Sequence, residues 1–149
     1  MVARSMKKGT FLTAILMAGL LIAGYYYVTS QMEKQQLQDA VDAKFKVELS
    51  NVLGSVSMTM NDYTYRFVLS SVAAAASIAD LTSYEEQNDD LDISLHNLYI
   101  ALREEKSRAA VMSRASEIRE SIALLLVDPA NKRATDKLKQ LAEDTFFEG

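Results

Sequence analysis

The side chains in this sequence that could carry out chemistry are few, and they are not grouped. The chain has no cysteine, which excludes thiol catalysis, disulfides and cysteine-ligated metals. Its only histidine, His96, lies beside the apolar stripe of a predicted helix and belongs to no motif. A nucleophile needs an adjacent base, and neither a glycine-rich phosphate loop nor a metal-ligand spacing occurs. We therefore predict no catalytic residue, no bound cofactor and no metal, and expect a protein that is not an enzyme.

The densest group of charged side chains is the acidic stretch YEEQNDDLD, residues 84–92. A calcium site is one interpretation, but the stretch lacks the spaced oxygen ligands and the central glycine of a calcium loop. Asp and Asn are preferred N-caps, and acids near a helix start favour its dipole. The stretch therefore predicts a turn at 87–90, with Asp89 or Asp90 capping the next helix.

The overall charge distribution argues against nucleic acid as a partner. Residues 31–149 hold all 20 acidic side chains and 13 of the 16 basic ones, a net charge of −7. A segment of that charge repels the phosphate backbone. Opposite charges three or four residues apart, such as Glu105 and Arg108, predict pairs on an exposed helix face.

Two groups of residues remain as candidate interaction sites. Small residues fill 70–77, and among them Ser70, Ala74 and Ser77 either let helices pack closely or leave a shallow cleft for a ligand or partner helix. Phe146 and Phe147 have no place in the apolar stripe of the last predicted helix. They are either a docking point for another protein or rings that fold back onto the bundle.

The first thirty residues have the pattern of a membrane anchor. Residues 1–9 carry Arg4, Lys7 and Lys8, and the 19 residues 10–28 carry no charge. As a helix this stretch is about 28 Å long, close to the roughly 30 Å hydrocarbon core of a bilayer. Basic residues before the span predict that residues 1–9 stay in the cytoplasm. Aromatic residues are enriched where a membrane helix meets the headgroups, and we expect Tyr25, Tyr26 and Tyr27 to lie there at the outer end of the span.

Other interpretations of this segment stay open. A signal peptide also has a basic start and an apolar middle, and Val28 and Ser30 are small enough to precede a cut after Ser30. The leader MKKGTFL resembles that of type IV pilins, although Ala14 stands where pilins normally have glutamate. A small-xxx-small pair, Gly19 and Ala23, could also bring two spans together as a homodimer.

Beyond the span, apolar residues recur at helical spacing, and breakers are rare, with five glycines and one proline in the whole chain. We predict helices over 31–60, 62–86 and 91–127, and a last helix opened by Asp128 and Pro129. Asn61 or Asp62 is the expected cap of the second helix. The predicted stripe of the first of these helices is Leu37, Val41, Phe45, Leu49, Val52, Val56 and Met60. The predicted core of the later helices is Leu98, Leu102, Ile118, Ile122 and Leu125.

The sequence therefore predicts an all-α protein, with one N-terminal transmembrane helix and an antiparallel three- to four-helix bundle over 31–149 outside the cytoplasm. This topology resembles the extracytoplasmic four-helix sensory domains of bacterial receptors, which return through a second span that is not found here. We expect an interaction or sensing module tethered to the cell membrane, as an accessory subunit of another membrane or envelope protein. The alternatives are a subunit of a pilin-like envelope assembly and a secreted helical domain.

Overall fold

The fold was analysed in a computed structural model that describes the backbone of residues 3–147 and the side chains of residues 13–146. Within these residues every regular element is a helix, which confirms the predicted all-α class. The chain divides into two units, Met1–Leu37 and Gln38–Gly149. The side chains of Arg4, Lys7, Lys8 and Phe147, which the sequence singled out, lie outside the described residues.

The first helix, α1 (Ala3–Val56), contributes residues to both units. The helix expected over 31–60 is thus the last part of α1, and it ends four residues early. The middle of the predicted stripe is buried, from Phe45 to Val56. The two ends of the stripe, Leu37 and Met60, are exposed, and Met60 lies beyond the end of α1.

The second helix, α2 (Asp62–Ala79), begins as predicted. The Asn61 side chain accepts hydrogen bonds from the backbone N–H of Tyr63 and Thr64, and Thr64 Oγ1 accepts one from the Asn61 N–H. This reciprocal arrangement satisfies N–H groups that the helix cannot pair itself. The predicted end at residue 86 is wrong, since α2 stops at Ala79 and residues 80–90 form turns.

Contacts distant in sequence explain this early end. Asp42 of α1 accepts hydrogen bonds from the backbone N–H and the hydroxyl of Ser83. Buried Asn88 donates from its side-chain amide to the Pro129 carbonyl and to Thr135 Oγ1, both at 2.8 Å. These bonds hold the 80–90 segment as a turn, and its Asp, Asn, Thr and Ser residues are themselves weak helix formers.

The single helix predicted over 91–127 is also wrong. The structure has three helices there, α3 (Leu91–Arg103), α4 (Glu105–Ser113) and α5 (Ala115–Val127). Glu104 is extended, with φ −77° and ψ 128°, and Arg114 leaves the helical region, with φ −103° and ψ 21°. The apolar stripe shifts its register between Leu102 and Val111, and the chain accommodates the shift with breaks instead of the gradual drift of one straight helix.

The last helix, α6 (Lys132–Ala142), begins later than predicted and continues into a short π-helix, η1 (Glu143–Phe147). Its cap is Asn131, whose side chain accepts from the Ala134 N–H at 3.1 Å. Pro129 lies three residues before α6 begins, so it is not part of the first helical turn; it is buried in the preceding turn. Asp128 instead accepts a bond from the Ala130 N–H within that turn.

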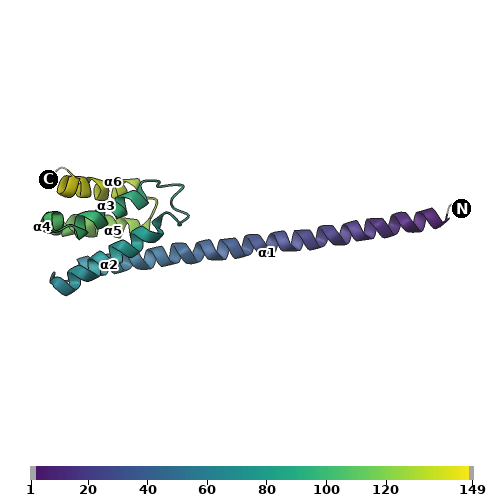
Figure 1. The fold of residues 1–149 in the computed structure, drawn as a ribbon, viewed down its shortest axis with the longest axis horizontal. Coiled ribbons are helices and arrows are strands. Elements are labelled where there is room, and N and C mark those ends of the chain that lie inside the picture. Colours follow the sequence, from purple (N-terminus) through teal and green to yellow (C-terminus); the bar gives the residue numbers. More distant parts are fainter. Residues whose placement is uncertain (1–2, 148–149) are drawn as a thin grey trace. The chain divides into compact units, whose positions relative to one another are not determined.

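The second unit packs around α3, which contacts α2, α4 and α6, while α5 packs on α6 (Figure 1). The predicted core is confirmed, since all five of its members have no exposed surface: Leu98, Leu102, Ile118, Ile122 and Leu125. Residues of α1, α2 and α6 complete the same apolar cluster. This bundle fixes the positions of the side chains that line the two cavities described below.

Candidate functional site

The break between α3 and α4 is closed by two side chains. At a break, the last carbonyl groups of a helix lose the N–H donors of the following turn. The Ser107 hydroxyl donates to the Ala101 carbonyl at 2.7 Å, and the hydroxyl of Tyr65, from α2, donates to the Leu102 carbonyl. Both donors are buried. Tyr65 thereby ties the end of α3 to α2 and has a fixed ring position.

The Tyr65 ring supports an arginine from the next helix. The guanidinium carbon of Arg108, in α4, lies 3.7 Å from the centre of the Tyr65 ring, within the range of a cation–π contact. Burial raises the pKa of the Tyr65 hydroxyl, and the positive charge of Arg108 acts in the opposite direction. The guanidinium therefore stacks on a neutral, hydrogen-bonded phenol whose own position is held by the end of α3.

The ion pair of Arg108 differs from the predicted one. Among the described residues, Arg108 pairs with Asp62 at 3.3 Å, and not with Glu105 on its own helix. The Asp62 side chain is 91% exposed, whereas that of Arg108 is 43% exposed. Exposed pairs of this kind contribute little to stability. Asp62 is thus a weak partner at the edge of the site, and Arg108 is its better fixed member.

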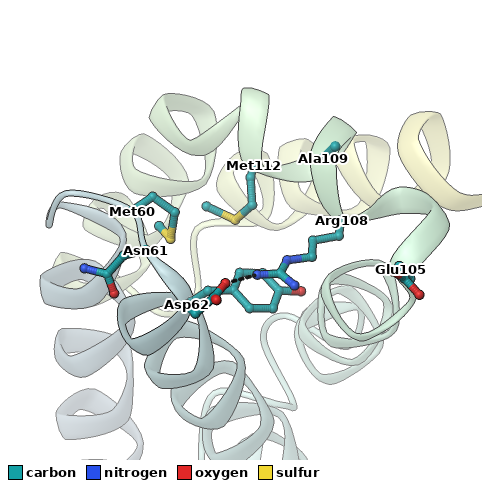
Figure 2. Close-up of a pocket in the computed structure, with 8 residues that line it drawn as sticks. Met60, Asn61, Asp62, Glu105, Arg108, Ala109 and Met112 are labelled. Atoms are coloured by element: carbon teal, nitrogen blue, oxygen red, sulfur yellow. Dashed lines mark hydrogen bonds and ion pairs between the residues drawn. The ribbon is translucent and has the colours of Figure 1, made fainter.

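These residues line a cavity of about 330 Å³, which we call the Arg108 cavity. Figure 2 shows Met60 and Met112 on the same side of the guanidinium, with Asp62 joined to it by the drawn ion pair. Its lining residues are Met60, Asn61, Asp62, Tyr65, Glu105, Arg108, Ala109 and Met112. The lining combines a cationic hydrogen-bond donor with apolar methionine side chains. This combination suits the binding of a small amphipathic molecule.

A second cavity, of about 340 Å³, lies between α2 and α3. It brings together two features that the sequence singled out separately, the small-residue segment and His96. The lining residues are Ala73, Ala76, Ser77, His96 and Tyr99. His96 is exposed, and its ring centre is 6.3 Å from that of Tyr99. The Ser77 hydroxyl donates to the Ala74 carbonyl at 2.8 Å, so it acts first as a local helix contact.

The other residues of the predicted interaction site lie apart from this cavity or have further roles. Ser70 is exposed on α2, and Ala74 is half-buried; neither lines the second cavity. Phe146 is half-buried against the core, with Lys106 Nζ 4.4 Å from its ring centre. Phe146 therefore contributes to packing, and its role in docking stays a prediction.

The acidic segment is used for contacts within the protein. Lys139 pairs with Asp90 at 3.2 Å, and Lys132 lies 3.9 Å from Asp89. Asp90 occupies the N-cap position of α3, as predicted, but its side chain makes no capping hydrogen bond. Among the described residues, no group of three or more His, Cys, Asp or Glu side chains is arranged to hold a metal ion. The segment therefore orders the turn between α2 and α3.

The apolar part of α1 forms the candidate membrane site. Thr13–Val56 of α1 is long enough to cross a bilayer and contains a window of mean hydropathy 1.4, none of it buried. A signal sequence meets the same criteria of length and composition. Tyr25, Tyr26 and Tyr27 are exposed, and the first two rings meet edge to face at 6.1 Å. A side chain added at Gly19 would meet nothing within 4 Å.

The Arg108 cavity was missed at the sequence level. Its residues come from the α1–α2 turn, α2 and α4, and α4 was predicted to be the middle of a longer helix. The sequence singled out several of its residues for other roles: Met60 in an apolar stripe, Asn61 or Asp62 as a helix cap, and Glu105 and Arg108 as an ion pair. Comparisons with protein-family models, with curated proteins and with solved structures found no match for this chain.

Proposed function

We propose that this protein is a helical interaction or sensing module, held at the cell membrane by the apolar part of α1 and acting as an accessory subunit of another membrane or envelope protein. One observation carries the proposal. The uncharged stretch of 19 residues lies in a continuous helix, and its described side chains, from Thr13 to Val28, are all exposed.

Exposure of this kind is costly in water. Leu20 is 68% exposed, Leu21 is 72% exposed and Ile22 is 59% exposed. Burying one such side chain stabilises it by about 1.5–3 kcal/mol. A bilayer would cover all of these side chains at once, and a helix satisfies its own backbone hydrogen bonds there. The three basic residues before the stretch favour an N-terminus in the cytoplasm.

The side chains around the two cavities support binding in preference to catalysis. The Arg108 cavity combines one stacked arginine with methionines, and the second cavity has His96 and Tyr99 beside small residues. Neither arrangement pairs a nucleophile with a base within hydrogen-bond distance among the described residues, as covalent catalysis requires. A module that binds another molecule, and passes the signal to a partner protein by direct contact, needs only such binding surfaces.

The absence of native cysteine allows a direct test of the anchor and its orientation. Ser5→Cys and Ser116→Cys introduce single thiols before the span and at an exposed position of α5. In intact cells, a membrane-impermeant maleimide should label the second variant and not the first, and both should react after detergent lysis. Labelling of the first variant alone would refute the proposed orientation.

The mass of the protein purified from these cells distinguishes the retained anchor from the secreted domain and the pilin-like subunit. Retention of residues 1–30 supports the anchor. A product beginning at Gln31 would indicate a secreted domain, and one beginning at Thr10 would favour the pilin-like assembly. Association with a membrane partner is tested by photo-crosslinkers at exposed Ser70 of α2 and exposed Arg119 of α5. A partner crosslinked to the same extent from both positions, or from neither, would count against a defined contact surface.

A further inference from the structure

We propose that the Arg108 cavity binds a small organic monocarboxylate with a compact apolar body. The inference goes beyond the proposed function and does not depend on where the protein is located. It follows from the position of Arg108, from the charges beside the cavity, and from the two methionines on one side of the guanidinium.

The guanidinium is held in place but incompletely paired. Stacking 3.7 Å from the Tyr65 ring centre fixes its plane, and the Tyr65 hydroxyl is itself bound to the end of α3. Among the residues that the structure describes, its one hydrogen bond is donated by Nη2 to Asp62 at 3.3 Å. A guanidinium has five N–H donors in a fork that matches a carboxylate. A ligand carboxylate can therefore replace the exposed Asp62 side chain at little cost.

The helix ends make the cavity favourable for an anion. Asp62 and Tyr65 belong to the first turn of α2, and Glu105 and Arg108 belong to the first turn of α4. Two helix N-termini thus adjoin the cavity and carry partial positive charge. The Asn61 side chain already binds two N–H groups of α2, and α3 ends directly before α4, so Arg108 is the main positive group. Asp62 and Glu105 are exposed acids at its edge, so they disfavour a ligand with more than one negative charge. With one arginine beside two acids, the cavity accommodates at most one negative charge, which would pair with Arg108.

The remaining lining receives the apolar part of the ligand. Met60 and Met112 lie on the same side of the guanidinium in Figure 2, and the methyl group of Ala109 adds to the apolar lining. Methionine adapts its shape to an apolar partner and makes favourable contacts with aromatic rings. A volume of about 330 Å³ is at the low end for ligand sites. It therefore fits a single ring or a short branched chain.

The probe for this site is phenylacetate, with phenylacetamide as its uncharged match. The full chain is purified in detergent with isotope-labelled methionine methyl groups and titrated by NMR. Phenylacetate should shift the Met60 and Met112 signals saturably, in the millimolar range expected for so small a ligand. Met17 and Met32, in the other unit, should not shift. The proposal would be overturned if phenylacetamide shifted these signals as much as phenylacetate does. It would also be overturned if the cationic phenethylamine bound more strongly than phenylacetate, or if phenylacetate gave no saturable shift.

Three variants assign the binding to Arg108. Arg108→Gln should weaken phenylacetate binding about tenfold or more, because a hydrogen-bonded charge is lost. Arg119→Gln, at an exposed position of α5, should leave the affinity unchanged. Asp62→Asn should strengthen binding several-fold by removing the competing carboxylate. Unchanged binding in Arg108→Gln, or weaker binding in a folded Asp62→Asn variant, would refute the site. Circular dichroism of each variant confirms that the helices remain.

Discussion

Tyr65→Phe tests whether the break between α3 and α4 depends on a side-chain hydrogen bond. The change removes one oxygen and keeps the ring on which Arg108 stacks. In the native protein the Tyr65 hydroxyl donates to the Leu102 carbonyl, and Tyr65 is only 6% exposed. The Leu102 carbonyl would then be buried beside a phenylalanine ring without this donor.

The expected loss follows from the cost of leaving a buried polar group unpaired, about 1–3 kcal/mol. Each kcal/mol corresponds to a fall in Tm of roughly 4–8 °C for a domain of about 100 residues. Tyr63→Phe is the matched control, because Tyr63 lies in the same helix and is 80% exposed. Surface changes of that kind stay within about 0.5 kcal/mol of the native stability.

The measurement is thermal unfolding of the full chain in mild detergent, followed by circular dichroism. A clear fall in Tm for Tyr65→Phe, with little change for Tyr63→Phe, supports the side-chain cap. Equal, small effects of both changes would mean that the end of α3 does not need the Tyr65 hydroxyl. Since the ring remains, Tyr65→Phe should also leave phenylacetate binding nearly unchanged, which separates the structural role of Tyr65 from ligand binding.

Three further changes test the core, the acidic turn and the C-terminal end. Ile122→Ala, at a site with no exposed surface, should cost about 2–5 kcal/mol in denaturant unfolding, whereas Arg119→Ala on the same helix should cost little. Burial raises the pKa of Glu85, and nearby acids add to the effect, so its ionised form destabilises the fold. Glu85→Gln should therefore raise Tm at neutral pH. This gain should shrink as pH falls through the raised pKa of Glu85 in the folded state, because the native Glu85 carboxyl then becomes protonated and neutral. An equal gain at all pH values would refute this account. Phe146→Ala should lower the free energy of unfolding by about 1–2 kcal/mol, since the ring is half-buried against the core, and no loss would favour a docking role alone.

Local periodicity was enough to predict the class and the core of this fold. The stripe positions from Phe45 to Val56 and the pair Ile118 and Ile122 are buried as their helical spacing requires. The Asn61 cap was also predictable, because capping depends on neighbours within three residues. Each of these features is determined within one or two helical turns of sequence.

The helix ends that the sequence missed depend on partners far along the chain. Asp42 and Ser83 are about forty residues apart, as are Asn88 and Pro129, and these bonds end α2 and shape the following turn. The break at Glu104 is stabilised in part by Tyr65 of α2. Neither helix end is marked by glycine or proline, so the sequence favoured longer helices, and the distant hydrogen bonds decide where each helix stops.

The same break explains why the Arg108 cavity was not predictable. Glu105 and Arg108 are three residues apart within one helix, whether or not it is broken at Glu104, so their pairing was the natural expectation. The extended conformation of Glu104 starts a new helix instead and directs Arg108 towards Tyr65 and Asp62 of α2. The Tyr65 hydroxyl thus caps the last turn of α3, and the Tyr65 ring supports the Arg108 guanidinium. Stability at the break and binding in the cavity therefore share a residue but use different atoms, so single-atom changes can test them separately.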